Sequence, residues 1–398
     1  MGEIKAFVEC DTFLNVIDSD SNSIVLSHRL SGVMTPPVER SPVMTLTLHQ
    51  VIIVGNLTDQ VKFSELTLDM FRMLQTLERE PQDDMSQVYD RSPAPAPMRV
   101  PLENGSGNGV TRPRENPHKY LLYKPTLPQL LVFLASGYKE LPPNGALLLY
   151  ISADGSFPTR PRPEDTGYDM GGVLMSPKRD VEPSNNKNSG QYKEHCCLYP
   201  GDLFPFTRRP TFLIVDSDNS LAFSSIPHYF DMPLVVLMSP QDTPPMFQEY
   251  CTHKGSLFTL FLHSPLAAFC FVTNIIDVPI KLWDKCLTYV ERFMSEASRL
   301  LTRCRGVGEL TFKSLGKISF SIFSFLDASY INFLGDDFLR LMLCRYIFCD
   351  SLLRIHRSFR VSCNQNINNN AYLLESYLTL QFSVLTILSQ VPPTTSGA

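Results

Sequence analysis

Short apolar runs separated by stretches with helical periodicity are the feature that most restricts how this chain can fold. The runs are residues 49–55 (HQVIIVG), 119–125 (KYLLYKP), 145–152 (GALLLYIS), 211–218 (TFLIVDSD) and 233–240 (PLVVLMSP). Strands that are apolar along their whole length are buried on both faces, which is typical of a parallel sheet covered by helices. The sequence therefore predicts an α/β fold with an open, mostly parallel sheet and flanking helices.

Helices are predicted between and after these strands. Residues 64–80 carry a serine N-cap and a following proline, and their apolar stripe consists of Leu68, Phe71, Leu74 and Leu77. Residues 128–140 have an apolar face, and residues 219–230 leave room for one more helix. Residues 277–304 and 336–359 are long amphipathic segments. They predict a helical C-terminal part after the sheet.

Composition divides the chain into parts. We expect a strand–helix segment at 1–81 and a disordered linker at 82–116, where Pro, Gly and Ser are frequent. A sheet domain is expected at 117–280, with a loop at 153–194 that is too long for an ordinary connection. The helical part is expected at 281–360.

Charge and cysteine usage restrict the functional class. Hydrophobic residues make up 43% of the 398 residues and charged residues 19%, so a sizeable core is expected. The net charge of −5 gives no basic face for direct nucleic-acid binding. Ten scattered cysteines without a signal-peptide pattern favour free thiols in a reducing compartment.

Residues 256–276 (SLFTLFLHSPLAAFCFVTNII) contain no Asp, Glu, Lys or Arg, so their length suits a membrane span. His263, Ser264 and Pro265 lie in the middle of this segment, however. We therefore favour a buried helix that is kinked or broken at Pro265 over a membrane span.

Asp216 and Asp218 are the most enzyme-like residues, because they end a predicted strand at the edge where open α/β sheets bind ligands. Two carboxylates there would hold Mg²⁺ or act as acid and base. The alternative is a simple strand-to-helix turn in which Asp216, Ser217, Asp218 or Asn219 caps the next helix. The chain has no GxxxxGK[ST], GxSxG or HExxH motif. A non-catalytic protein is therefore expected, and a metal- or nucleotide-dependent enzyme is the alternative.

A zinc site is the other candidate for chemistry. Its residues would be His195, Cys196, Cys197, Cys251 and His253. Structural zinc sites pair their ligands as CxxC or HxxxH, and neither spacing occurs here. We expect no metal and no cofactor.

The loop at residues 198–210 (LYPGDLFPFTRRP) combines proline, aromatic and arginine residues, a composition that suits partner binding. The predicted partner-binding residues are Tyr199, Phe204, Phe206, Arg208 and Arg209. The alternative is that the three aromatic residues pack under the sheet as a small satellite core.

Several of these segments also resemble one protein family. They are QVKFSELTLDMFRMLQTLEREP, RENPHKYLLYKPT, YPGDLFPFTRRPTFLIVDSDNS, KGSLFTLFLHSPLAAF and FLGDDFLRLMLCRYIFC. The pattern is similar to that of the suppressor of cancer cell invasion (SCAI) family over about residues 10–360.

The resemblance implies a nuclear co-repressor, with some protein in the cytoplasm. Family members bind myocardin-related transcription coactivators and repress serum-response-factor targets, including adhesion and migration genes. They also act in DNA-break repair through chromatin-bound adaptors. The resemblance supplies no catalytic motif.

The sequence departs from the family pattern in three places. Family members have a long helical region before the segment that matches Met1. Residues 306–326 interrupt the pattern as a foreign insert, and residues 361–398 match nothing in it. Retained introns or a gene-model error would explain both of these segments.

Overall fold

The computed structural model describes residues 14–17, 23–24, 35–57, 117–158, 167–177, 196–226, 229–240, 243–248, 255–303 and 328–356. Outside these residues lie the predicted helix at 64–80, the whole linker at 82–116, the insert at 306–326 and the tail at 361–398. So does much of the loop at 153–194.

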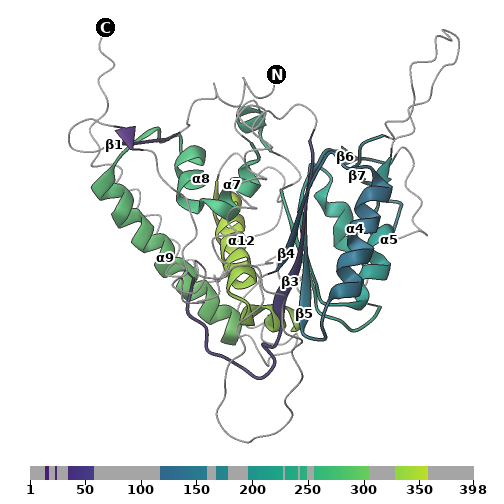
Figure 1. Ribbon diagram of the computed structural model, residues 1–398. Helices are drawn as coiled ribbons and strands as arrows, with labels where there is room; N and C mark the ends of the chain where they lie inside the picture. Colours follow the sequence, from purple (N-terminus) through teal and green to yellow (C-terminus); the bar gives the residue numbers. More distant parts are fainter. Residues whose placement is uncertain are drawn as a thin grey trace, which may run out of the picture.

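A five-stranded parallel sheet forms the centre of the molecule (Figure 1). Its strands are β3 (Thr47–Asn56), β4 (His118–Tyr123), β5 (Gly145–Ala153), β9 (Thr211–Asp216) and β10 (Leu234–Met238). All five lie where the apolar runs predict them, which confirms the α/β fold. Their order is β10-β9-β5-β3-β4. Numbered along the chain from the β4 edge, this is the 2-1-3-4-5 order of doubly wound sheets, in which the direction of winding reverses after the second strand.

Helices cover both faces of the sheet, as Figure 1 shows. On one face lie α4 (Leu127–Glu140), α5 (Pro200–Leu203) and the 3₁₀ helices η2 (Phe204–Arg208) and η3 (Ser220–Ser225). On the other lie α7 (Leu257–His263), α8 (Pro265–Val272), α9 (Ile280–Arg303), α12 (Asp337–Ile355) and the 3₁₀ helix η4 (Ala328–Gly335). The helix predicted within 219–230 is therefore only the short 3₁₀ turn η3.

Alternation along the strands divides the apolar residues into two cores. In β5, Leu148 and Tyr150 face the α7–α12 side, whereas Leu147 and Leu149 face the α4 side. All four are buried. This two-sided burial explains why the strand is apolar throughout. The segments predicted as separate parts, 1–81 and 281–360, contribute β3 and the pair α9–α12 to the same core.

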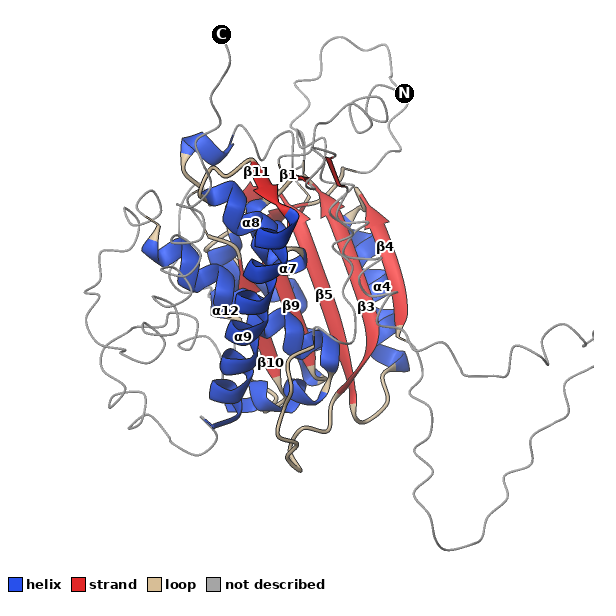
Figure 2. Cartoon of the chain, turned by 90° about the vertical axis from the view of Figure 1, so that its left-hand side faces the viewer, coloured by secondary structure: helices blue, strands red, loops and turns tan. Residues whose placement is uncertain are grey.

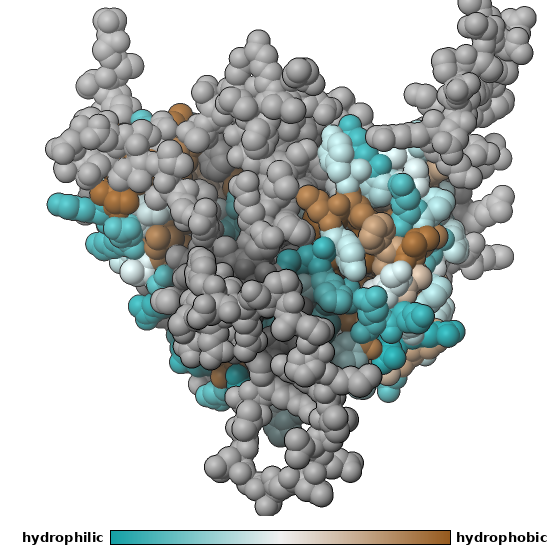
Figure 3. All heavy atoms as spheres, in the orientation of Figure 1, coloured by the Kyte–Doolittle hydropathy of each residue, from teal (hydrophilic) through white to brown (hydrophobic). Residues whose placement is uncertain are grey.

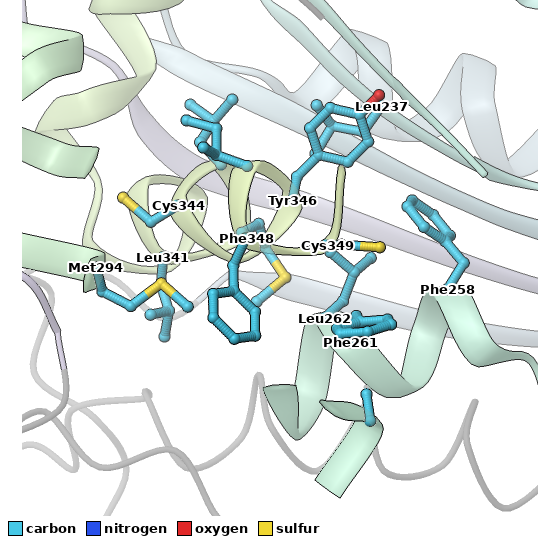
Figure 4. Packing of buried hydrophobic residues seen from close by; sticks show 14 of the residues in the cluster. Leu237, Phe258, Phe261, Leu262, Met294, Leu341, Cys344, Tyr346, Phe348 and Cys349 are labelled. Carbon is cyan, nitrogen blue, oxygen red and sulfur yellow. The ribbon is translucent and has the colours of Figure 1, made fainter. Parts of the chain in front are cut away.

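Helix α12 is buried on all sides between the sheet and the other helices. Figure 4 shows its side chains meeting those of α7, α9 and β10. The Phe348 ring lies 5.2 Å from that of Phe293 on α9 and 6.2 Å from that of Phe261 on α7. Two arginines, Arg340 and Arg345, are buried with the apolar residues, a feature that the sequence analysis missed.

The apolar segment 256–276 forms two short buried helices that meet at Ser264. Helix α7 ends at His263, and Pro265 occupies the first turn of α8, where its missing N–H costs no hydrogen bond. The predicted break at Pro265 is therefore confirmed. Among the described residues, no helix has the length and apolarity needed to cross a bilayer.

Two smaller three-stranded sheets complete the described fold. The first joins β1 (Asn15–Ile17), β2 (Ser23–Ile24) and β11 (Asp277–Pro279). The second joins β6 (Gly155–Ser156), β7 (Gly172–Leu174) and β8 (Cys197–Leu198). Because β6 follows β5 after one residue, this second sheet lies at the carboxyl edge of the main sheet.

A bulge in β3 ties this central strand to the start of α12. The pairing of β3 with β5 shifts between Leu48 and Gln50, so His49 is the extra residue. Asp336, the N-cap of α12, accepts hydrogen bonds from the backbone N–H groups of Phe338 and Leu339. Its second carboxylate oxygen accepts from the Leu48 N–H at 3.0 Å. One buried carboxylate therefore links two segments that are distant in the sequence.

Candidate partner-binding surface

The carboxyl edge of the sheet does not bring Asp216 and Asp218 together. Asp216 is buried on the α7 side, where its Oδ2 accepts from the Thr259 hydroxyl at 2.6 Å. Tyr150 lies 2.6 Å from the same hydroxyl and donates to it, because the Thr259 proton already points to Asp216. Asp218 is exposed, and it accepts from the Gly155 N–H in the β6 strand. The shared opening that the enzyme hypothesis requires is therefore not formed by these two carboxylates.

The turn after β9 holds loops together instead of capping a helix. The side-chain amide of Asn219 donates to the carbonyls of Ser156, Met170 and Gly172. Although Asn219 is the residue before η3, its side chain makes no capping hydrogen bond to that helix. The predicted capping role is therefore wrong for Asn219, whose amide binds β6 and β7 to the sheet.

Local structure also fills the place where the order of the strands reverses. Open α/β sheets bind ligands in this crevice, here between the ends of β3 and β5. Asn56, at the end of β3, donates to the Leu174 carbonyl at 2.6 Å and accepts from the Ser176 hydroxyl at 2.9 Å. Both ends of its amide are therefore engaged by the end of β7 and the segment that follows it.

The buried Asp216 predicts an unusual dependence of stability on pH. Burial raises its pKa from 3.8 to about 6, against the opposing effect of hydrogen bonds from Ser256 and Thr259. Since the folded state then binds the proton more tightly than the unfolded state, this group adds stability as the pH falls through 6. We expect a gain of about 1 kcal/mol between pH 7 and pH 5 from this carboxyl alone.

Urea unfolding of the parent chain and of Asp216→Asn at the two pH values measures this contribution. The difference in the free energy of unfolding between the two proteins should change by about 1 kcal/mol between pH 7 and pH 5. The control is Asp284→Asn, which alters an exposed carboxyl on α9. A pH dependence that is the same in the parent chain and in Asp216→Asn would contradict the prediction.

The zinc candidates form no cluster in the described part of the chain. His195, Cys251 and His253 lie outside the described residues, Cys196 is half-buried and Cys197 is buried in β8. The described residues contain no group of three potential metal ligands. Both cysteines carry free thiols.

Aromatic residues gather instead on the α4 side, around α5 and η2. We call this set the aromatic–arginine surface, and it consists of Tyr168, Tyr199, Phe204, Arg208, Tyr229 and Phe230. The ring of Tyr168 lies 5.4 Å from that of Tyr199, and the ring of Phe204 lies 5.9 Å from that of Tyr229. The Arg208 guanidinium stacks over Phe230 at 4.8 Å. Tyr229 is 66% exposed and Tyr168 43% exposed, so much of this aromatic area faces solvent.

Backbone and carboxylate contacts hold this surface in place. Asp202 accepts from the Tyr199 N–H at 2.9 Å and from the Tyr168 hydroxyl at 3.3 Å. The Gly201 N–H donates to the Gly167 carbonyl at 2.9 Å. A Cβ at Gly201 would collide with the Tyr168 ring, so this close packing requires glycine. Partial burial, with Cys197 and Asp202 nearby, raises the pKa of the Tyr199 phenol. The tyrosines are held before any partner arrives, which lowers the entropic cost of binding.

Three of the five predicted partner-binding residues, Tyr199, Phe204 and Arg208, belong to this surface. Phe206 and Arg209 turn towards α4, where the Phe206 ring lies 6.1 Å from Tyr138 and the Arg209 guanidinium 5.9 Å from it. Phe204 and Phe206 are half-buried against the α4-side core. The loop thus combines features of both predicted alternatives, a satellite core and an exposed aromatic face.

Sequence reasoning missed Tyr168, Tyr229 and Phe230. Tyr168 lies in the loop at 153–194, which was treated only as a long connection. Tyr229 and Phe230 lie between Pro227 and Pro233, a few residues before β10. The available signal was the same as in the predicted loop, namely aromatic residues among prolines and glycines.

Comparison with known proteins identifies the family. The family model described as "Protein SCAI" matches residues 1–359. The chain belongs to the SCAI family. It is 43% identical to human Protein SCAI over 365 residues, which cover 91% of this chain and 55% of the human protein. Mouse Protein SCAI is 42% identical over a similar range, and the Protein SCAI homolog of Dictyostelium discoideum is 28% identical over 499 residues.

The matches also show how much of the length of its SCAI relatives this chain covers. The chain spans about half the length of the human and mouse relatives. The matched region stops at residue 359, directly before the tail at 361–398 that departs from the family pattern. No solved structure matches the chain.

Proposed function

We propose that this chain is a nuclear transcription co-repressor that acts by binding other proteins and not by catalysis. Its proposed partners are coactivators of the myocardin-related class and serum response factor. The proposed outcome is restraint of adhesion and cell-migration genes. The observation that carries this proposal is the family match over residues 1–359, because the SCAI pattern implies this mode of action.

The charge of the chain supports an indirect action on DNA. With a net charge of −5 and a pI near 5.9, the chain offers little attraction for the phosphate backbone. We propose that its partners bring it to chromatin, and that the same mode of action applies to repair of DNA breaks. The proposed location is the nucleus, with a smaller cytoplasmic fraction.

The aromatic–arginine surface supports a binding role and supplies its proposed site. Tyrosine and arginine are frequent among the residues that dominate binding energy at protein interfaces. Here Tyr168, Arg208 and Tyr229 are exposed and are not needed to fill the core. The divergence of Asp216 and Asp218 also favours binding over the enzyme alternative.

Replacing Tyr229 and Arg208 together by alanine is expected to weaken binding of a myocardin-related coactivator by about tenfold or more. Both side chains are exposed, so the fold should remain intact. Co-immunoprecipitation from nuclear extract, followed by titration with purified coactivator, measures the effect. The matched control is Ile276→Ala with Arg292→Ala, a large apolar side chain and an arginine that are exposed elsewhere. Unchanged binding by the Tyr229/Arg208 variant would refute this site, and no binding by the parent chain would refute the proposed function.

A further inference from the structure

One face of the edge strand β4 is exposed although it is partly apolar. Tyr120 and Leu122 point to the α4 side, where the Tyr120 ring lies 5.1 Å from Phe133. Leu121 and Tyr123 point to the opposite face, because Leu121 pairs with Ile53, which belongs to the α7–α12 core. They are 36% and 50% exposed. Apolar atoms are visible on the surface around β4 and α4 in Figure 3.

The described helices do not cover this face of β4. In Figure 2, α7, α9 and α12 lie in front of β5, β9 and β10, while β3 and β4 lie to one side of them. The core on this side includes Val51 and Ile53 of β3 but no residue of β4. The other face of the strand is covered by α4, so the two faces of β4 differ in their exposure to solvent.

The winding of the sheet indicates which segment belongs there. The connections from β4 to β5, from β5 to β9 and from β9 to β10 all run towards the β10 edge, and their described helices lie on the α4 side. The connection from β3 to β4 runs in the opposite direction. Crossovers between parallel strands have the same hand in nearly all proteins, so reversing the direction moves the connection to the other face. The same hand therefore predicts that the β3–β4 connection crosses on the side of the sheet where β4 is exposed.

That connection contains residues 64–80, which lie outside the described residues. Their sequence has a serine N-cap, a terminating proline and an apolar stripe, the pattern of an amphipathic helix. A helix of this length would extend about 25 Å and β4 extends about 20 Å, so one helix suffices to cover the strand. We propose that residues 64–80 dock on the exposed face of β4 as an amphipathic helix, with the stripe against Leu121 and Tyr123. This proposal does not depend on the proposed function.

Photo-crosslinking in the full chain tests the docking directly. A benzoyl-phenylalanine is introduced in place of Leu121, and the crosslinked peptides are identified by mass spectrometry. We expect crosslinks within one chain to residues 64–80. The control is the same replacement at Val132, which is 64% exposed on α4 in the opposite layer and should give no such crosslink. Crosslinks from position 121 to a second copy, to another protein or to other segments only would overturn the proposal.

A thermal double-mutant cycle adds an independent test that needs no crosslinker. Leu74→Ser and Leu121→Ser each remove one side of the proposed contact. The loss of Tm in the double variant should therefore be smaller than the sum of the single losses by about 2 °C. In the control pair, Leu74→Ser and Val132→Ser, the losses of Tm should add. Additive losses for Leu74 and Leu121 would overturn the proposal.

Discussion

Replacing Arg345 by alanine is expected to lower the free energy of unfolding by about 3–5 kcal/mol. One guanidinium nitrogen, Nη1, donates to the carbonyls of Leu262 and His263 at 2.8 and 2.6 Å. These carbonyls lie at the C-terminal end of α7, where a positive charge also complements the helix dipole. Alanine would leave both carbonyls without these hydrogen bonds and open a cavity between α12 and α7. Urea unfolding monitored by circular dichroism measures the loss.

Two further variants separate the effect of the lost hydrogen bonds and charge from the effect of the lost side-chain volume. Arg345→Met keeps most of the volume but removes the donors, so its cost should be about 1–3 kcal/mol. Burial lowers the pKa of Arg345 to about 9, which shows that the charge itself is costly here, and methionine removes that cost. Arg292→Ala on the exposed face of α9 should change stability by less than about 0.5 kcal/mol. Equal effects of Arg345→Ala and Arg292→Ala would contradict this account of the core.

Replacing Asp336 by alanine is expected to cost about 2–4 kcal/mol, the second large effect. The change removes the N-cap of α12 and leaves the buried Leu48 N–H in the β3 bulge without its acceptor. Asp336→Asn keeps an oxygen for the cap but places an amide nitrogen against the Leu48 N–H. It should therefore lose only the link to β3.

Denaturant unfolding and amide hydrogen exchange distinguish these two variants. In Asp336→Asn, the exchange of the Leu48 amide should accelerate while the first turn of α12 remains protected. The control is Asp337→Ala, which removes the partly exposed carboxylate that contacts Arg340. A stability loss for Asp336→Ala no larger than that of the control would show that the β3–α12 link contributes little.

The pattern of the sequence was enough to predict the sheet but not its supporting contacts. Strands β3, β5, β9 and β10 are buried on both faces, so their sequences are apolar almost throughout. Strand β4, at the edge of the sheet, is partly exposed. The break at Pro265 was predictable because proline cannot continue a helix. The roles of Asp336 and Arg345 were not predictable, since their partners, Leu48 and Leu262, are distant in the sequence.

The candidate site shows the same limit. Aromatic composition indicated Tyr199, Phe204 and Arg208. Tyr168 joins them through the packing of its loop against Gly201, and Tyr229 joins them through its ring contact with Phe204. The paired aspartates suggested catalysis because they end a predicted strand at the edge where open α/β sheets bind ligands. In the structure Asp216 is buried against α7, whereas Asp218 is exposed in the turn after β9 and accepts from β6, a separation that the sequence pattern does not reveal.

Hydrogen exchange of the purified chain, with and without a myocardin-related coactivator, tests the central claim most directly. The proposal predicts slower exchange in residues 167–170, 196–209 and 229–231, which carry the aromatic–arginine surface. The surrounding strands should be unchanged, because the surface is already held in place. A complex whose protection lies entirely elsewhere in the chain would contradict the proposed site, and the absence of any complex would contradict the proposed function.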